Sequence, residues 1–367
     1  MLEFDLGLVF STSGPYAALG QAGLAGAELA IADLEREGIA RIAPVTCDPA
    51  GRPEAYEAMT RDILAGGVSH VVGAITSWSR KDMIPVLERY GAMLWYPCPY
   101  EGFESNDHVV YMGGAPNHHM IPLLDRVLSQ GTRCAYLLGS NYVWGWETLR
   151  LARERLSAAG VEIVGERFVP LGDVDSDLAL SEIITEQPDV VVNSLIGPSN
   201  EAFLRGLPTG QRPTILSCNQ SEADLDVLGQ YGDGIISAGT YFEPLGPEDF
   251  VQRAREISPN GRCSCVFATS YASVRILAET VAKTGTTAPR AVFHAACDAR
   301  HETVLGPVQI DPITRHASLT PHIAQAENAQ FHLLSSAEGP VAADPYLTCV
   351  PPVSAPPLQT PSLRIVK

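Results

Sequence analysis

The chain alternates short apolar runs with longer amphipathic segments, and this alternation constrains its fold more than any other feature. The apolar runs, such as residues 70–75 and 189–194, are rich in Val, Ile and Leu and apolar on both faces. Strands of that kind occur in parallel sheets that helices cover on both sides. Because helix-length segments separate the runs, the order predicts doubly wound α/β lobes.

The alternation runs to about residue 241. The expected strands are residues 5–11, 42–47, 70–75, 92–96, 109–112, 134–139, 163–169, 189–194, 214–218 and 235–241. The expected helices are residues 19–37, 54–66, 79–90, 118–130, 144–159, 177–186, 199–206 and 221–229. The pattern then predicts helices at 247–256, 266–283 and 289–297, followed by an antiparallel meander of strands 303–310, 319–326 and 331–335.

Length and charge narrow the class of protein. A chain of 367 residues with 46% hydrophobic residues fits about two globular domains. No apolar run reaches the roughly 18 residues of a membrane-spanning helix. The net charge of -17 argues against nucleic acid or an anionic membrane as a direct partner, because phosphate binding needs clustered Lys and Arg. Residues 346–367 are rich in proline and predict an extended arm or a disordered tail.

The cysteines indicate the compartment. Eight cysteines are dispersed along the chain, several inside apolar strand-like runs, as Cys134 is. Such cysteines suit a reducing cytosol better than an oxidising periplasm. Residues 1–5 also show neither the basic nor the apolar segment of a secretory signal. We therefore expect a cytoplasmic protein, with the periplasm as the alternative if a signal peptide has been removed.

The loop at residues 95–104, Trp-Tyr-Pro-Cys-Pro-Tyr-Glu-Gly-Phe-Glu, is the first candidate binding element. Two prolines one residue apart cannot continue a helix or a central strand, so they stiffen the loop. The loop follows an apolar strand, and open α/β sheets bind ligands beyond the carboxyl ends of their strands. We expect Tyr96, Cys98 and Pro99 to line a pocket for a small polar molecule.

Other strand ends supply further candidates. Ser77 and Ser79 either cap the helix that follows strand 70–75, or mark a helix N-terminus that holds an anion or carbonyl oxygen. Residues 141–147 place Tyr142, Trp144 and Trp146 at another strand-to-helix turn, where aromatic groups either wall a pocket or pack in the core. Residues 195–199 and 219–222 complete the set, with Glu222 read as a first-turn helix carboxylate.

The sequence offers little support for catalysis. The glycine spacing in residues 14–20 is wrong for a dinucleotide fingerprint, and no phosphate-binding loop or nucleophile elbow is present. Cys263 and Cys265 are too close together for a usual zinc pair, and no second pair follows at ligand spacing. Cys98 has no His partner marked by a motif. We expect no enzyme activity, no metal and no cofactor.

Several motifs together resemble the type I solute-binding proteins, the family of branched-chain amino acid, urea and amide receptors. The resemblance spans about residues 5–346 and is strongest to the amide-sensing negative regulators of aliphatic amidase operons. The matching motifs are Ser77-x-x-Arg80-Lys81, Tyr96-Pro97-x-Pro99-Tyr100-Glu101-Gly102-Phe103-Glu104, Ala115-Pro116-Asn117, Gly139-Ser140-Asn141-Tyr142 and Gly306-Pro307-Val308.

The resemblance implies two α/β lobes joined by three crossovers that close on a ligand like a hinge. The first lobe would hold residues 1–113 and 242–301, the second 114–241 and 302–346, with 347–367 as a C-terminal arm. In this family the serine at Ser77 holds the ligand carbonyl or carboxylate, and Tyr142 closes from the second lobe. The expected ligand-binding residues are Ile75, Thr76, Ser77, Tyr96, Cys98, Pro99, Tyr142, Trp144, Leu195, Gly197 and Glu222.

Two departures from the family pattern bear on the ligand. Cys98 replaces a threonine that is usual in close relatives, and Ile75 stands where the amide sensor has a tyrosine. Both changes remove a hydroxyl, which predicts a ligand larger or less polar than acetamide. Amino acid receptors of the family bind the ammonium group with an acidic residue of the second lobe. Glu222 lies near that place, so an amino acid ligand stays open.

The function expected from the resemblance is a cytoplasmic sensor of a small amide or urea-like ligand. It would regulate amidase or nitrile-metabolism genes through a partner, which in the relatives is an RNA-binding antiterminator. The alternative is the substrate-binding component of an ABC importer for amides, urea or branched-chain amino acids, with a permease as its partner. A homodimer is compatible with the acidic surface and the proline-rich arm.

Overall fold

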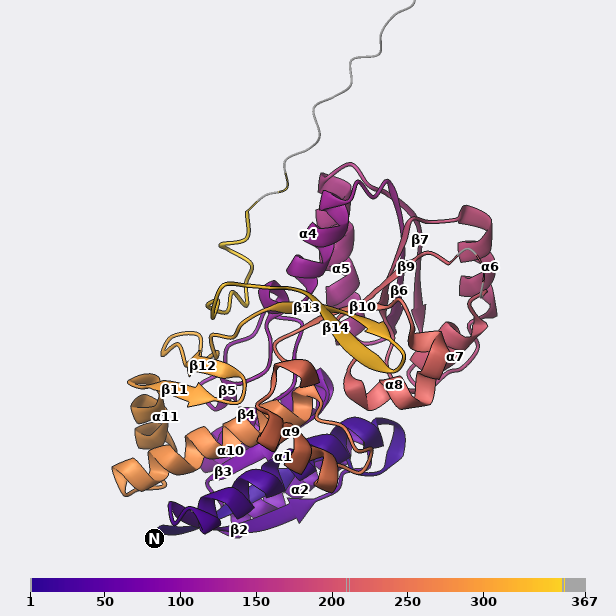
Figure 1. Cartoon of the computed structure of the whole chain (residues 1–367). Helices are drawn as coiled ribbons and strands as arrows, with labels where there is room; N and C mark the ends of the chain where they lie inside the picture. Colours follow the sequence, from indigo (N-terminus) through magenta and orange to yellow (C-terminus); the bar gives the residue numbers. More distant parts are fainter. Residues whose placement is uncertain (1, 209, 211, 352, 354–367) are drawn as a thin grey trace, which may run out of the picture.

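A computed structural model describes residues 2–208, 210, 212–351 and 353. The chain forms two α/β lobes, each built on a sheet of mainly parallel strands (Figure 1). This architecture is the type I periplasmic binding protein fold that the alternation and the motifs predicted. Among the described residues, no helix combines the length and apolar character that crossing a membrane requires.

The first lobe contains a five-stranded parallel sheet. In spatial order its strands are β2 (Ala40–Cys47), β1 (Leu2–Val9), β3 (His70–Gly73), β4 (Met93–Tyr96) and β5 (Val109–Tyr111). Its helices are α1 (Ala17–Arg36), α2 (Pro53–Ala65), α3 (Ser77–Tyr90), α9 (Glu248–Ile257), α10 (Cys265–Thr284) and α11 (Pro289–Cys297). Helix α1 packs along α10 and α2 along α3, so helices cover the sheet.

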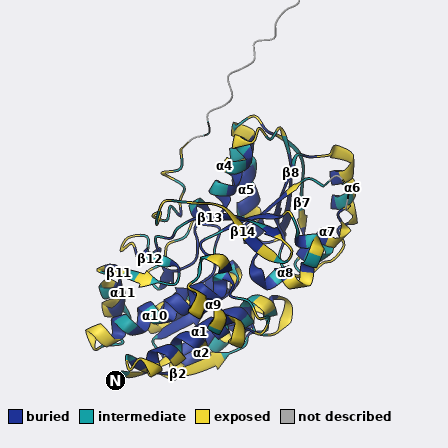
Figure 2. Cartoon of the chain, in the orientation of Figure 1, coloured by how far each residue is buried: buried dark blue, intermediate teal, exposed yellow. Residues whose placement is uncertain are grey.

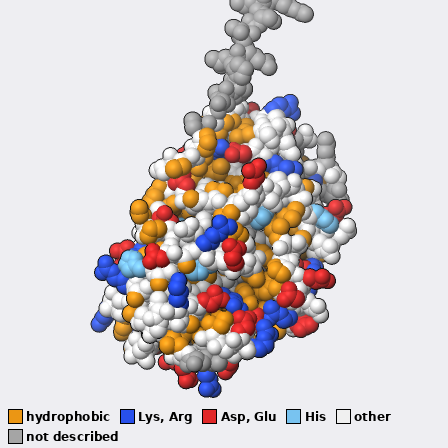
Figure 3. Space-filling view, turned by 60° about the vertical axis from the view of Figure 1, so that its left-hand side comes forward, with side chains coloured by type: hydrophobic (Ala, Val, Ile, Leu, Met, Phe, Trp, Pro, Cys, Tyr) orange, Lys and Arg blue, Asp and Glu red, His pale blue; other side chains and the backbone are white. Residues whose placement is uncertain are grey.

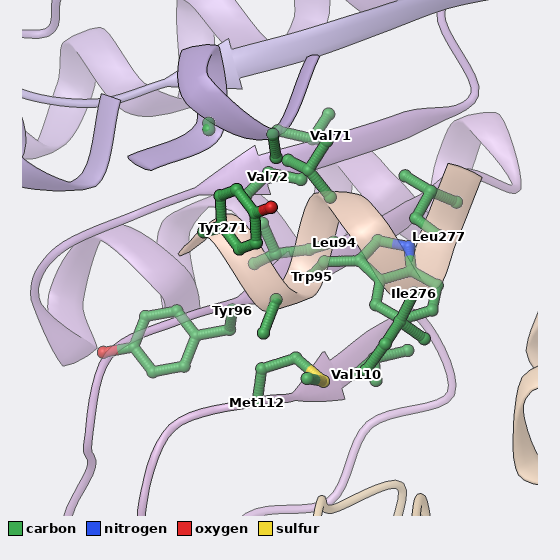
Figure 4. Close-up of a cluster of buried hydrophobic side chains, with 14 of the residues drawn as sticks. Val71, Val72, Leu94, Trp95, Tyr96, Val110, Met112, Tyr271, Ile276 and Leu277 are labelled. Atoms are coloured by element: carbon green, nitrogen blue, oxygen red, sulfur yellow. The ribbon is translucent and has the colours of Figure 1, made fainter. Parts of the chain in front are cut away.

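The core of this lobe explains why its central strands are apolar on both faces. All residues of β3, β4 and β5 are buried, and the ring of Trp95 lies beside Ile276 and Leu277 of α10 (Figure 4). The ring of Tyr96 extends away from that cluster (Figure 4). Helix α10 is buried along much of its length (Figure 2). The alternation along β4 therefore directs Trp95 toward α10 and Tyr96 to the other face, at the end of the strand, where Tyr96 is also buried.

The second lobe contains a seven-stranded sheet. Its parallel strands are β6 (Cys134–Ser140), β7 (Glu162–Val169), β8 (Val190–Ser194), β9 (Thr214–Ser217) and β10 (Ile236–Gly239), and β13 (His322–Glu327) and β14 (Gln330–Ser336) add antiparallel to β10. Its helices are α4 (Met120–Ser129), α5 (Val143–Ala158), α6 (Asp177–Glu186), α7 (Pro198–Gly206) and α8 (Glu222–Leu228). Alternate residues of β6 enter two separate core clusters, so this sheet is also covered on both faces.

The chain passes between the lobes three times: after β5, after β10, and before β13. Helices α9, α10 and α11 return to the first lobe's core, and β13 and β14 pair with the second sheet. The division at residues 113, 241 and 301 stays a prediction. Packing favours a later third passage, because Val308, Ile310 and Leu319 belong to the first lobe's core.

The prediction of one antiparallel meander after residue 303 was wrong. Strands β11 (Arg300–Thr303) and β12 (Gly306–Gln309) instead form a separate two-stranded hairpin, while β13 pairs with β14. A tight turn interrupts the expected strand 303–310. Thr303 Oγ1 donates to the Gly306 carbonyl and accepts from the Leu305 N–H, and Gly306 has a φ of 82°. Glycine suits that left-handed conformation, which a strand cannot contain.

The C-terminal arm is described only at its start. Leu347 and Val350 pack against the second lobe's core, while residues 352 and 354–367 lie outside the described residues, so the prediction for that tail is not addressed. On the face shown in Figure 3, acidic and basic side chains are interspersed among apolar ones. That face carries no continuous basic patch of the kind that binds nucleic acid.

Candidate ligand-binding site between the two lobes

A cavity lies where strand ends of both sheets meet. It contains about 1080 Å³ of empty space, part of which opens to solvent. The first lobe lines it mainly with residues that follow β1, β3 and β4, and the second lobe with residues that follow β6, β8, β9 and β10. Each of these is the carboxyl end of a parallel strand, the edge at which open α/β sheets bind ligands.

All eleven residues expected from the sequence line this cavity. Ile75, Thr76 and Ser77 begin α3, whereas Tyr96, Cys98 and Pro99 follow β4. Tyr142 and Trp144 begin α5, Leu195 and Gly197 precede α7, and Glu222 begins α8. The structure thus brings together residues from five strand ends, and their contact with a ligand stays a prediction.

Ser79 and Trp146 lie in the same predicted strand-to-helix turns, but neither lines the cavity. Thr76 is the N-cap of α3, and its Oγ1 accepts from the Ser79 N–H at 3.2 Å, so Ser79 completes a capping box. The Trp146 side chain is 46% exposed, and its Nε1 donates to Asn141. Trp144 is the buried tryptophan, and its Nε1 donates to Asn219 Oδ1 at 2.9 Å across the cavity wall.

Sequence reasoning missed part of the wall. The missed lining residues are Tyr16, Leu19, Gly114, His119, Asn200, Cys218, Asp224, Ala238, Gly239, Thr240, Tyr241, Phe242, Cys265 and Val266. Ile196, Asn219, Gln220 and Ser221 also line the cavity, and they belong to the strand ends 195–199 and 219–222 named from the sequence. The strand-end rule applied to β1 would have found Tyr16. Cys265 and Val266 lie at the start of α10. No local sequence pattern marks them as cavity residues, because only the tertiary fold brings that helix to the cavity.

A buried charge cluster stands behind Ser77. The Ser77 hydroxyl donates to the Glu101 carboxylate. The Arg80 side chain, 0% exposed, donates from Nε to Glu104 Oε1 at 2.6 Å and from Nη2 to Glu101 Oε1 at 3.4 Å. Its guanidinium also lies 4.8 Å from the ring centre of Tyr96. The cluster holds the first-lobe wall of the cavity in one arrangement.

The charges in this cluster stabilise one another. Burial acts to raise the pKa of Glu104, but the charge and hydrogen bonds of Arg80, with those of Lys81, outweigh it and hold the pKa at about 2. Burial likewise acts to lower the pKa of Arg80, and Glu101, Tyr96 and Glu104 instead raise it well above its usual value. Arg80 and Glu104 therefore form an ionised pair within the motif.

Glu222 is the contrasting carboxylate on the second-lobe wall. It is 2% exposed, and its Oε1 accepts the backbone N–H of Glu243 at 2.7 Å. Its Oε2 is buried and has no hydrogen-bond partner. Burial raises the pKa of Glu222 to about 8. Asp224, which also lines the cavity, has its pKa raised to about 6 by burial.

Other buried polar atoms of the cavity wall also lack partners. They are the Tyr96 hydroxyl, His119 Nδ1 and Gln220 Nε2. Buried polar groups in proteins are normally hydrogen-bonded, and each one left unpaired costs about 1–3 kcal/mol. Unpaired donors and acceptors gathered on one cavity are what a site shows when its ligand supplies the missing bonds.

The cavity is poorly equipped for covalent or metal chemistry. Cys98 Sγ donates to the Ala74 carbonyl at 3.6 Å, and burial raises the pKa of the Cys98 thiol to about 12. Such a thiol stays protonated at neutral pH and is a poor nucleophile. Among residues 2–208, 210, 212–351 and 353, no group of three or more His, Cys, Asp or Glu side chains is arranged to hold a metal ion.

Two α/β lobes that the chain links three times, with a cavity between their strand ends, define a two-lobed binding protein of the type I fold. The sequence matches the family described as "Periplasmic binding protein domain" over residues 4–352. The chain belongs to that family.

Solved structures share the fold at low sequence identity. A solute binding protein of an ABC transporter from Rhodopseudomonas palustris BisB5, in complex with 3,4-dihydroxybenzoic acid, is 18% identical with a TM-score of 0.83, covering 92% of this chain and 98% of that one. An amino acid ABC transporter substrate-binding protein from Pseudomonas fluorescens Pf-5 is 18% identical, with a TM-score of 0.81 and coverage of 94% and 98%. The branched-chain amino acid binding protein LivJ from Streptococcus pneumoniae, in complex with isoleucine, is 19% identical, with a TM-score of 0.80 and coverage of 91% and 98%.

Proposed function

We propose that this protein is a non-catalytic binding protein that closes its two lobes over a small amide, urea-like or amino acid solute. The observation that carries the proposal is the cavity between the strand ends, on which several buried polar atoms lack partners. A ligand with N–H and C=O groups would satisfy those atoms, since Glu222 offers an acceptor and Gln220 a donor. A ligand that contacts both walls binds the closed form better than the open one and so stabilises closure.

As partner we propose the permease of an ABC importer, which would make this chain the substrate-binding component. Membership of the periplasmic binding protein family supports this proposal over the sensor that the motifs first favoured. The solved proteins of similar fold include a solute-binding protein of an ABC transporter in complex with 3,4-dihydroxybenzoic acid and substrate-binding proteins of amino acid transporters. On this proposal the protein works in the periplasm.

The second candidate is the cytoplasmic amide sensor acting through an antiterminator-like partner. Its support is that all eight cysteines, each within the described part of the chain, have free thiols. Free thiols persist in a reducing compartment. Fractionation of the native cells separates the candidates, because recovery with periplasmic markers supports the importer and recovery in the cytosol supports the sensor.

A thermal-shift screen tests the proposed function itself. The panel contains amides, ureas, amino acids and aromatic carboxylates, each at several concentrations. A solute that binds the folded protein stabilises it by about 2.7 kcal/mol at 100 times its Kd, so the melting temperature should rise with concentration. If no member of the panel shifts the melting temperature, the proposed function is wrong.

A further inference from the structure

The second-lobe side of the cavity presents one hydrogen-bond donor and one acceptor whose roles are fixed by their neighbours. They are Gln220 Nε2 and His119 Nδ1, and neither atom has a hydrogen-bond partner within the part of the chain that the structure describes. From these two atoms we infer a neutral polar subsite for a ligand group that both accepts and donates, either a carboxamide or a hydroxyl. The inference rests on the proposed function and specifies its solute as an amide with a second, uncharged polar group.

A chain of three side-chain amides fixes the donor. The Leu195 N–H, which can only donate, bonds to Asn193 Oδ1 at 3.0 Å. The nitrogen of the same amide therefore faces the other way, and it donates to Asn200 Oδ1 at 2.7 Å. Asn200 Nδ2 in turn donates to Gln220 Oε1 at 3.1 Å. Each bond orients the next amide, which leaves Gln220 Nε2 as the free end of the chain.

Burial keeps this chain in one orientation. Asn193 is 1%, Asn200 6% and Gln220 4% exposed, so little water can replace a broken bond. The Gln220 carbonyl oxygen also accepts from Ser237 Oγ at 2.8 Å, which holds the residue just beyond β9. Turning one amide over would set two oxygens or two N–H₂ groups against each other. Gln220 is therefore a fixed donor on the cavity wall.

His119, the N-cap residue of α4, supplies the acceptor. Its Nε2 lies 3.2 Å from the carbonyl oxygen of Tyr100. A carbonyl oxygen can only accept, so Nε2 carries the ring proton. Burial lowers the pKa of His119 to about 4, which leaves the ring neutral at neutral pH and gives Nδ1 a lone pair.

Trp144 connects the two residues along the cavity wall. Its ring centre is 5.5 Å from that of His119, and its Nε1 donates at 2.9 Å to Asn219, the residue before Gln220. The other end of the Asn219 amide donates to the Leu195 carbonyl at 3.0 Å. Trp144 and Asn219 have thus used their hydrogen bonds within the protein. A polar ligand group at this part of the wall meets Gln220 and His119 instead.

The fixed donor and acceptor discriminate between ligand groups. The carbonyl of a carboxamide can accept from Gln220 while its N–H₂ donates to His119, and one hydroxyl can make both bonds. An ammonium group has no acceptor for Gln220, and a carboxylate has no proton for His119. A methyl group would leave both buried atoms unpaired, which is unfavourable.

Matched compounds test this discrimination by isothermal titration. Succinamide, 4-hydroxybutanamide, 4-methylpentanamide, succinamic acid and 4-aminobutanamide share one amide and two methylene groups and differ only in the second end. Equivalent series with one methylene fewer and one more cover other cavity lengths. In the series that fits best, succinamide or the hydroxyamide should bind at least about tenfold tighter than the apolar and charged compounds. Equal or tighter binding of an apolar or charged compound in every series would overturn the inference.

Two variants remove the donor and the acceptor in turn. Gln220→Met keeps the length of the side chain but loses Nε2, and His119→Phe keeps a ring but loses Nδ1. Each should lower the preference for succinamide over 4-methylpentanamide at least about fivefold, the scale of one hydrogen bond. The controls are Gln325→Met on β13 and His294→Phe on α11, at positions that do not line the cavity. A preference that survives in either cavity variant contradicts the inference.

Asn193→Leu tests the amide chain from outside the cavity wall. Asn193 does not line the cavity, but its loss frees the amides of Asn200 and Gln220 to turn over together. Gln220 can then present its oxygen to an ammonium group. The preference for succinamide over 4-aminobutanamide should fall at least about fivefold, while the preference over 4-methylpentanamide changes less than about twofold. If the first preference is unchanged, the chain does not fix the donor and the inference is overturned.

The same titrations separate this inference from the proposed function. If the bifunctional amides do not bind but another solute of the thermal-shift panel does, the neutral subsite is wrong and the proposed function stands. If no solute of either set binds, both are wrong.

Discussion

Glu222 is a buried carboxyl group whose protonation should control the stability of the ligand-free protein. Its pKa is raised to about 8, so the folded protein keeps a proton that the unfolded chain loses above about pH 4.3. Stability that depends on this proton is present at low pH and is lost as the pH rises toward 8. Between pH 6.5 and 8 the loss should be about 2 kcal/mol, at 1.36 kcal/mol per pH unit.

Urea unfolding at pH 6.5 and pH 8 checks this expectation. Over this interval the wild type should lose about 2 kcal/mol of unfolding free energy relative to Glu222→Gln. Buried histidines such as His118, with its pKa lowered to about 4 by burial, act in the opposite direction, because the unfolded chain's histidines lose their protons near pH 6.5. They are the same in both proteins, so the difference between the two proteins isolates Glu222. Parallel losses in the two proteins would contradict the assignment.

Arg80 carries the second prediction at this scale. The Arg80 side chain is the counter-charge of two buried carboxylates. The Arg80→Met variant would therefore leave the carboxylates of Glu101 and Glu104 without that counter-charge. Removing one partner of a buried ion pair costs about 3–5 kcal/mol. Lys81→Met is the control, because Lys81 contacts the same carboxylates but is 41% exposed and should cost less than about 1 kcal/mol. Comparable losses in urea unfolding would show that the cluster does not depend on Arg80.

The site could be predicted from residues that follow strands closely in sequence. Tyr96 and Ser77 stand at strand ends that the apolar pattern marks, and the loop after Tyr96 carries its own motif. Cys265 could not be found this way, because α10 reaches the cavity only through its packing against α1. The engagement of Ser77 with Glu101 was also hidden, since it depends on side-chain direction in a loop 24 residues away.

At the scale of elements, local pattern predicted the strands and helices wherever the strand–helix order was regular. Every expected strand up to residue 241 appears, from β1 to β10. The strand prediction failed at Thr303, because the apolar residues that start there are compatible with a turn as well as with a strand. The hydrogen bonds of Thr303 and the φ of Gly306 decide between strand and turn there, and neither is visible in apolar periodicity.

Helix α5 offers a prediction at this scale, because its first turn carries Tyr142 and Trp144. A Cβ on Gly145 would lie 1.9 Å from the Ser140 carbonyl oxygen, a backbone atom at the end of β6. Gly145→Ala should therefore push α5 away from its strand and cost at least about 1–3 kcal/mol. Gly339→Ala, where a Cβ meets nothing within 4 Å, is the control. Chemical unfolding of both variants measures the difference, and equal stability would mean that α5 adjusts freely.

At the scale of the whole molecule, the two lobes meet through aromatic side chains beside the cavity. The ring centres of Trp78 on α3 and Tyr142 at the start of α5 are 5.4 Å apart in an edge-to-face contact. Trp78 is 39% exposed, so it contributes little to the core of its own lobe. The contact exists only when the lobes are together, and it should therefore favour the closed form specifically.

Trp78→Ala should then weaken ligand binding without unfolding either lobe. An aromatic pair contributes about 0.5–1.5 kcal/mol, which corresponds to roughly two- to twelvefold in Kd. Titration with a solute from the thermal-shift screen measures the affinity, and small-angle scattering measures how far the radius of gyration falls on binding. Trp146→Ala, on the exposed side of α5, is the control and should change neither. Unchanged affinity in Trp78→Ala would mean that the ligand alone holds the lobes together.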